Sequence, residues 1–182
     1  MKSNNPKIRY IKLDSENINL AYDIQKTIFK DDPNYANFLS KLNNEDKFET
    51  CFIVYFEDNP IGITGTYLED IDSKSIWLDW YGVLEEYRRQ GFGKQILLDT
   101  INYCKSLNRF DYFRLDTTYW ENRPVIKLYD DIMHLREEYT IEDTDTIKHN
   151  WLIYTYNLRE NKNIEPWNNR NLYLNEHYEN LI

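Results

Sequence analysis

The sequence holds few of the residues that build disulfide frameworks and metal centres. Its 182 residues include two cysteines, Cys51 and Cys104, and three histidines scattered along the chain. Two cysteines are too few for a disulfide framework, and neither belongs to a cluster with metal-ligand spacing. We therefore expect two buried thiols and no metal site.

Long apolar runs are also missing. No stretch approaches the roughly 20 apolar residues that span a bilayer, and Met1–Pro6 has no apolar segment of the signal-peptide type. Hydrophobic residues make up 41% of the chain and charged residues 29%, which is the balance of a globular protein. The sequence therefore predicts a cytoplasmic protein with no membrane partner.

Positive charge is in short supply, since the formal net charge at pH 7 is −9. Nucleic-acid phosphates demand a basic surface, so this charge argues against a nucleic-acid partner. It favours cationic partners such as amines, through electrostatic steering. An acidic surface that serves solubility alone is the alternative explanation.

What the chain does contain is an alternation of strand and helix patterns. The order predicts a hairpin followed by a strand–helix–strand unit, and hence an α/β fold with a mixed sheet, a parallel pair at its centre and helices on both faces. Strands are predicted at 8–13, 48–56, 61–68, 75–83, 112–117, 139–142 and 151–156, and helices at 18–28, 35–42, 91–107 and 123–132.

The most informative segment is Val83–Lys94, in which an apolar strand ends, a charged turn follows and a helix begins. The first N–H groups of a helix have no internal partner, and the macrodipole favours anions there. Gly91 and Gly93 let a phosphate approach the backbone without a Cβ in the way. The alternative is an ordinary strand-to-helix connection with solvated arginines. The basic residues of the segment are Arg88, Arg89 and Lys94.

Two common phosphate-binding patterns do not fit this segment: GxxxxGK[ST] is absent, and GxGxxG fails because position 96 is Ile. The Arg-x-x-Gly-x-Gly pattern after a strand ending in Val resembles the acetyl-CoA-binding motif of the GNAT N-acetyltransferases. In that family the turn wraps the coenzyme pyrophosphate. The resemblance implies coenzyme contacts from Arg88, Arg89, Gln90, Gly91, Phe92, Gly93 and Lys94.

A second segment, Asn122–Tyr129, resembles the family's Asn-x-x-Ala-x-x-Leu-Tyr pattern, with Val125 in the Ala position. The resemblance implies a coenzyme contact from Asn122, which also suits a helix N-cap. It implies that Tyr129 protonates the departing thiolate; a core tyrosine is the alternative. The family's usual Gly is replaced by Met133, so we expect the end of this helix and the following loop to differ.

The strand that ends at Val83 carries the remaining site residues. The resemblance implies a splayed sheet in which Tyr81 and Val83 bind the pantetheine arm through their backbone. Asp79 lies two residues before Tyr81, so regular alternation places both on one face, and we take Asp79 as the candidate general base. Glu69 and Asp70 are the runners-up, and a structural hydrogen-bonding role for Asp79 is the alternative.

The resemblance covers residues 7–158 and implies a catalytic domain over 1–158. It implies an acetyl-CoA-dependent N-acetyltransferase that acylates a primary amine of a small molecule or peptide by direct transfer. The alternatives are a non-catalytic acyl-CoA-binding module or sensor, and an interaction protein that uses the aromatic end of the chain. The extension at 159–182 is rich in Asn and aromatic residues. We expect a docked segment, the arm of a homodimer or partial disorder there.

Overall fold

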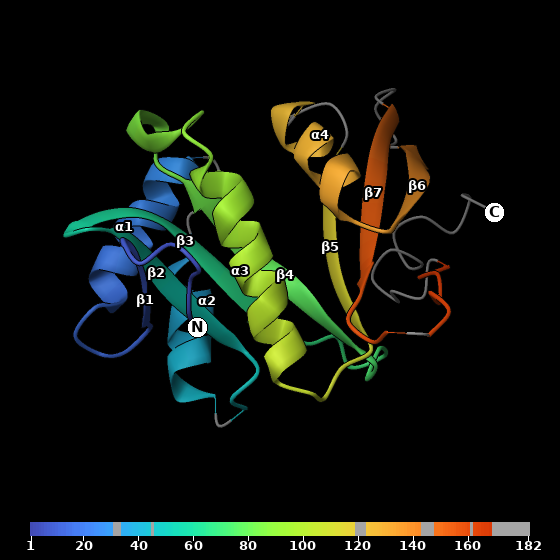
Figure 1. The fold of residues 1–182 in the computed structure, drawn as a ribbon, viewed down its shortest axis with the longest axis horizontal. Coiled ribbons are helices and arrows are strands. Elements are labelled where there is room, and N and C mark those ends of the chain that lie inside the picture. The colour runs from blue at the N-terminus through green and yellow to red at the C-terminus, as the bar shows by residue number, and fades with distance from the viewer. Residues whose placement is uncertain (31–33, 45, 119–122, 143–147, 161, 169–182) are drawn as a thin grey trace. The chain divides into compact units, whose positions relative to one another are not determined.

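The computed structural model describes residues 1–30, 34–44, 46–118, 123–142, 148–160 and 162–168 (Figure 1). Among these residues, no helix has the length and apolar character that crossing a membrane requires. The elements are β1 (Ile8–Lys12), α1 (Ile18–Ile28), α2 (Tyr35–Asn43), β2 (Thr50–Phe56), β3 (Asn59–Tyr67), β4 (Ser75–Val83), the 3₁₀ turn η1 (Glu85–Tyr87), α3 (Phe92–Ser106), β5 (Tyr112–Thr118), α4 (Arg123–Ile132), β6 (Leu135–Glu142) and β7 (Lys148–Asn157).

The strands form a seven-stranded mixed sheet with the hydrogen-bonding order β1-β2-β3-β4-β5-β7-β6. β4 and β5 run parallel, whereas β1–β2, β2–β3, β5–β7 and β6–β7 are antiparallel. The predicted mixed sheet with a parallel pair at its centre is confirmed. The described register of that pair joins Ser75–Trp77 to Tyr112–Arg114, although β4 continues to Val83.

The chain divides into two compact units. Unit 1 comprises Met1–Leu68 and Leu78–Asn108, and unit 2 comprises Glu69–Trp77 and Arg109–Ile182. β4 therefore contributes its first residues to unit 2 and its remaining residues to unit 1. The domain bounds of 1–158 and 159–182 stay a prediction.

In unit 1, helices cover both faces of the strands, with α1 and α2 on one face and α3 on the other (Figure 1). The apolar positions of α1 recur at helical spacing, so Ile18, Ala21 and Ile24 are all buried and pack in one core cluster with Phe38 of α2. A second cluster joins Ile96 and Phe92 of α3 to the strands. The sequence patterns thus place one apolar layer on each side of the sheet.

In unit 2, the described end of the chain packs against the strands. Trp167 is fully buried, and its ring meets that of Trp77 edge to face, with 4.9 Å between centroids. The Tyr112 hydroxyl donates to the Asn163 carbonyl at 3.0 Å. Of the three predictions for the extension, docking therefore describes the segment up to Asn168. Residues 169–182 lie outside the described part of the chain.

Backbone hydrogen bonds close the helix end at Met133, and its difference from the family stays a prediction. The Met133 N–H donates to the Tyr129 carbonyl at 2.8 Å, and the next N–H, of His134, donates to Thr155 of β7 at 2.9 Å. The chain passes straight from α4 into β6, which begins at Leu135 rather than at the predicted Tyr139. Pairing with β7 thus takes up the backbone where the family has its glycine.

Candidate functional site

The turn between β4 and α3 has the backbone that the Gly91 motif predicts. The 3₁₀ turn η1 closes with a bond from the Arg88 N–H to the Glu85 carbonyl at 3.1 Å. Gly91 then takes a left-handed conformation, with φ of 86°, at the N-cap of α3. The first intrahelical bond runs from the Gln95 N–H to the Gly91 carbonyl, so the earlier N–H groups of α3 point out of the helix start.

Gly91 and Gly93 have different structural roles in this turn. A Cβ at Gly91 would meet no atom of the described structure within 4 Å, so glycine serves here for its positive φ and leaves the approach to the helix start open. A Cβ at Gly93 would lie 3.1 Å from the Tyr81 hydroxyl, which donates to the Gly93 carbonyl at 2.7 Å. Gly91 therefore fits the predicted anion contact, while Gly93 makes room for Tyr81.

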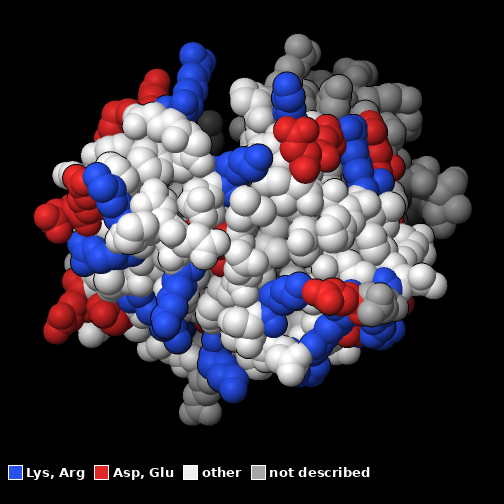
Figure 2. All heavy atoms as spheres, in the orientation of Figure 1, with Lys and Arg blue, Asp and Glu red and all other residues white. Residues whose placement is uncertain are grey.

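Two polar side chains of the turn donate hydrogen bonds to nearby backbone carbonyls. Arg88 Nε donates to the Val83 carbonyl at 2.9 Å, which ties the turn back to the end of β4. Gln90 Nε2 donates to the Glu86 carbonyl at 3.0 Å. The surface that faces the viewer in Figure 2 carries both basic and acidic side chains rather than a field of one sign. The exposed residues of this turn are Glu85, Glu86, Arg88, Arg89, Gln90, Gly91 and Lys94.

A break in the strand alternation of β4 places Asp79 away from Tyr81. Trp80 has a φ of 38°, in the left-handed region that bulky residues seldom adopt. Asp79 and Trp80 consequently both face α2: the Asp79 carboxylate pairs with Lys41, and Trp80 Nε1 donates to Asn37 Oδ1 at 2.9 Å. Two successive side chains on one face are the mark of a β-bulge.

Tyr81 and Val83 face the opposite way, toward α3. The Tyr81 hydroxyl bonds to Gly93 of that helix, and Val83 belongs to the apolar cluster that contains Phe92. The prediction that Asp79 shares their face is therefore wrong, because the left-handed Trp80 shifts the alternation by one residue. A Cβ at Gly82 would lie 2.6 Å from a methyl carbon of Ile28, so glycine avoids a close contact there.

The Asp79 carboxylate lies in a largely buried ion pair. Its Oδ2 is 2.9 Å from Lys41 Nζ, and the two side chains are 16% and 3% exposed. Lys41 Nζ also donates to the Thr66 carbonyl at 2.8 Å. Desolvation raises the pKa of Asp79 above its usual value, against the opposing effects of the Lys41 ammonium and a backbone hydrogen bond from Trp80, with a further small rise from Glu49. A raised pKa moves a carboxylate toward the range in which a general base works.

Unit 2 carries the second predicted catalytic residue, Tyr129, on α4. Tyr129 is 6% exposed, and its ring lies 5.5 Å from that of Tyr154 on β7. The Tyr154 hydroxyl donates to Asp130 Oδ1 at 2.8 Å, which fixes the neighbouring ring. Burial and this carboxylate raise the pKa of Tyr154. Tyr129 therefore sits in an aromatic cluster, and both predicted roles stay open; Asn122 lies outside the described residues.

The two alternative bases, Glu69 and Asp70, also belong to unit 2. Glu69 is half-buried, and its pKa is raised by desolvation and by the negative charges of Asp70 and Asp72. Asp70 is exposed. Among the described residues, no cluster of His, Cys, Asp and Glu is arranged to hold a metal ion.

Sequence reasoning missed Lys41, the partner of Asp79. A signal was present, because Lys41 follows Phe38 by three residues and so lies on the buried face of α2. A lysine on an apolar helix face needs a buried anion nearby. Asp79 is the matching signal, because it is a hydrophilic residue within an apolar strand.

The comparisons with known proteins agree with this geometry. A model of the acetyltransferase (GNAT) family matches residues 17–134. The chain therefore belongs to the acetyltransferase (GNAT) family. No curated protein matches the chain closely enough to be counted as a relative.

Solved structures of N-acetyltransferases share the fold at low identity. A ribosomal-protein-S18-alanine N-acetyltransferase from Escherichia coli has a TM-score of 0.62 at 15% identity, covering 87% of this chain and 99% of its own. A spermidine N-acetyltransferase from Vibrio cholerae, in complex with CoA and spermine, has a TM-score of 0.62 at 13% identity, covering 82% and 95%. A protein described as a phosphinothricin N-acetyltransferase has a TM-score of 0.64 at 13% identity, covering 84% and 99%.

Proposed function

We propose that this protein transfers the acetyl group of acetyl-CoA to a primary amine of a small molecule or peptide, by direct transfer. The observation that carries the proposal is the β4–α3 turn, where a left-handed Gly91 opens the start of a helix and where Arg88, Arg89 and Lys94 are exposed together with Glu85 and Glu86. Membership of the acetyltransferase (GNAT) family supports it.

In this proposal the turn binds the coenzyme pyrophosphate. The first N–H groups of α3 donate to phosphate oxygens, and Arg88, Arg89 and Lys94 supply positive charge. Gly91 leaves the backbone accessible, as its open surroundings allow. The main chain of Tyr81 and Val83 binds the pantetheine arm. The remaining contacts in this proposal come from Gln90, Phe92, Gly93 and Asn122.

The chemistry needs one proton acceptor and one proton donor. The amine nitrogen attacks the thioester carbonyl carbon, a C–N bond forms and the C–S bond breaks with its electron pair on sulfur. Asp79 accepts the proton that the amine loses, and Tyr129 gives its hydroxyl proton to the thiolate. The products are an N-acetyl amide and the free thiol of CoA. Solvent then returns both side chains to their starting protonation states.

The net charge of the protein supports a cationic class of acceptor. The net charge of −9 favours the approach of a cationic amine. Spermidine and the N-terminal alanine of a ribosomal protein, which the names of similar structures mention, represent a polyamine and a peptide amine. They are therefore the first two acceptors to test.

The deciding experiment is an acceptor screen that measures release of free thiol from acetyl-CoA. The panel contains spermidine, an alanine-initiated peptide, aminoglycosides and free amino acids, and calorimetry measures acetyl-CoA binding in parallel. Amine-dependent thiol release supports the proposal. Tight coenzyme binding without turnover on any amine would instead identify a binding module or sensor, and no coenzyme binding at all would overturn both readings.

A further inference from the structure

The ion pair between Lys41 of α2 and Asp79 of β4 is unusual in being almost fully desolvated on the lysine side. Lys41 is 3% exposed along its side chain and donates to the Thr66 carbonyl as well as approaching Asp79. Taking both charges out of water costs several kcal/mol per ion before their attraction is counted. A buried pair of this kind is therefore weak evidence for a role in stability alone.

The backbone around Asp79 indicates that its orientation matters. The left-handed Trp80 turns Asp79 toward Lys41 and away from the face of Tyr81. A bulky residue in that conformation costs on the order of 1–3 kcal/mol and persists where the surroundings impose it. The Trp80 indole is held by its bond to Asn37 and by an edge-to-face contact with Phe29 at 5.2 Å.

We propose that Lys41 is a positioning residue for the acetyl transfer, and that it acts by holding the Asp79 carboxylate ionised and oriented for the proton of the acceptor amine. This inference rests on the proposed function, with Asp79 as the base. Lys41 itself does not touch the reacting atoms. Its ammonium stabilises the anion that burial disfavours, so Asp79 stays able to accept a proton at lower pH.

Other groups also change the pKa of Asp79, so substitutions can be chosen that raise it and substitutions that lower it. Glu49, just before β2, opposes Lys41, because its negative charge raises the pKa of Asp79. The buried Cys51 thiol of β2 has its pKa raised to about 12 by desolvation and by Asp79, so it stays neutral in the working range. A backbone hydrogen bond from Trp80 also lowers the pKa of Asp79.

The charge that each substitution removes determines the direction in which the pKa of Asp79 changes. Lys41→Met removes the charge that favours the ionised carboxylate, so the pKa of Asp79 rises and the acidic limb of kcat/KM moves to higher pH. Glu49→Gln removes a charge that disfavours it, so the limb moves to lower pH. Lys41→Arg keeps the positive charge and is the matched control.

The experiment measures kcat/KM against pH for each variant, with spermidine or the most active amine of the screen, and divides it by the wild-type value. The ionisation of the amine is common to all proteins and cancels in this ratio. For Lys41→Met we expect the ratio to fall by roughly tenfold or more at the acidic end and to recover toward the alkaline end. For Lys41→Arg we expect a flat ratio, and for Glu49→Gln a ratio that rises toward the acidic end.

Melting curves separate a structural role from a positioning role. A Lys41→Met protein that melts at lower temperature while its ratio stays flat would overturn the inference. If Lys41→Met does not fold, Glu49→Gln provides the test by itself. A flat kcat/KM ratio for Glu49→Gln would then overturn the inference. Wild-type protein that releases no thiol with any amine would overturn the proposed function and this inference with it, whereas flat ratios in an active enzyme overturn the inference alone.

Discussion

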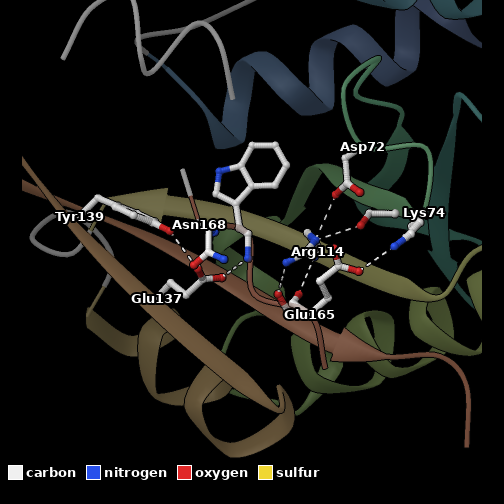
Figure 3. A network of polar contacts seen from close by, with 10 residues as sticks. Asp72, Lys74, Arg114, Glu137, Tyr139, Glu165 and Asn168 are labelled. Carbon is white, nitrogen blue, oxygen red and sulfur yellow. Dashed lines mark hydrogen bonds and ion pairs between the residues drawn. The ribbon is translucent and has the colours of Figure 1, made fainter. Parts of the chain in front are cut away.

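Among the described residues, a buried ion pair lies in each unit, and the two pairs differ in how much of each side chain is exposed. In unit 2, Arg114 Nε lies 3.2 Å from Asp72 Oδ2, and the side chains are 0% and 2% exposed. Arg114 also donates to Thr155 Oγ1 at 2.6 Å and to the Glu165 carbonyl at 2.8 Å (Figure 3). Its guanidinium lies 5.8 Å from the centroid of the Trp167 ring.

In unit 1, Lys41 is equally buried, but its partner Asp79 keeps 16% of its side chain exposed. Lysine offers a compact point charge, whereas the planar fork of arginine is organised for several bonds at once. The enclosed pair of Arg114 connects the end of the chain to the strands and suits a fixed structure. The pair with a partly open carboxylate suits a group that exchanges protons.

The largest expected effect comes from breaking the enclosed pair. Arg114→Met leaves Asp72 buried without its guanidinium, and we expect the free energy of unfolding to fall by about 3–5 kcal/mol. Urea denaturation measures it. The double variant Arg114→Met/Asp72→Asn removes both charges and should recover part of the loss. A single variant as stable as wild type would show that the network does not support the fold.

Tyr129→Phe tests whether unit 2 also contributes to chemistry. We expect kcat to fall by roughly 10²–10⁴, the range for general acid–base catalysis, with coenzyme affinity close to wild type. Tyr154→Phe is the matched control, because it removes a hydroxyl from the same aromatic cluster. Equal losses of affinity and rate for Tyr129→Phe would mean that Tyr129 is structural, and an unchanged rate would mean that another group protonates the thiolate.

The comparison is sharpest between Asp79→Asn and Asp72→Asn. We expect Asp79→Asn to slow the reaction by roughly 10²-fold at neutral pH, with activity recovering as pH rises and free amine accumulates. Asp72→Asn should lower the melting temperature and leave the shape of the pH–rate profile unchanged. If Asp79→Asn keeps the wild-type profile, Asp79 is not the base, and Glu69 or Asp70 becomes the candidate.

Gly91→Val addresses coenzyme binding through the backbone of unit 1. We expect acetyl-CoA affinity to fall by at least tenfold, about 1.4 kcal/mol, because valine disfavours the positive φ and fills the approach to the helix start. Calorimetry on a folded variant gives the value. Gly91→Asn is the control, since asparagine tolerates the left-handed conformation. Unchanged affinity in Gly91→Val would contradict the phosphate site.

The smallest effect is expected at an exposed ion pair of unit 2. Lys74 Nζ lies 2.8 Å from Glu165 Oε2, and the side chains are 53% and 40% exposed. Lys74→Ala should change the free energy of unfolding by about 0–1 kcal/mol, because solvent screens the pair. A loss comparable to that of Arg114→Met would remove the distinction between enclosed and exposed charges.

Local patterns were enough to predict the elements and the turn. The bounds of β4 and α4 are those read from the sequence, since alternation and helical spacing act over neighbouring residues. Gly91 was identifiable because a glycine at a helix start lets an anion approach the backbone, whereas its left-handed conformation came from the structure. The start of β6 was misplaced because pairing with β7, rather than local preference, decides it.

The polar partners were beyond reach of the sequence because they come from distant segments. Nothing local marks Trp80 as left-handed, so the face of Asp79 was predicted wrongly. Arg114 likewise draws its partners from Asp72, Thr155 and Glu165, which the fold alone brings together. The roles of Asp79 and Tyr129 in the reaction stay predictions.

The position of Trp167 also sets an order of events during synthesis. Every residue of unit 1 precedes Arg109, so its core can close while the ribosome is still making the rest of the chain. Unit 2 places Trp167 against Trp77, and Glu137 Oε2 accepts the Trp167 N–H at 2.7 Å (Figure 3). Trp77 therefore gains its contact with Trp167 only after the segment around Trp167 has emerged.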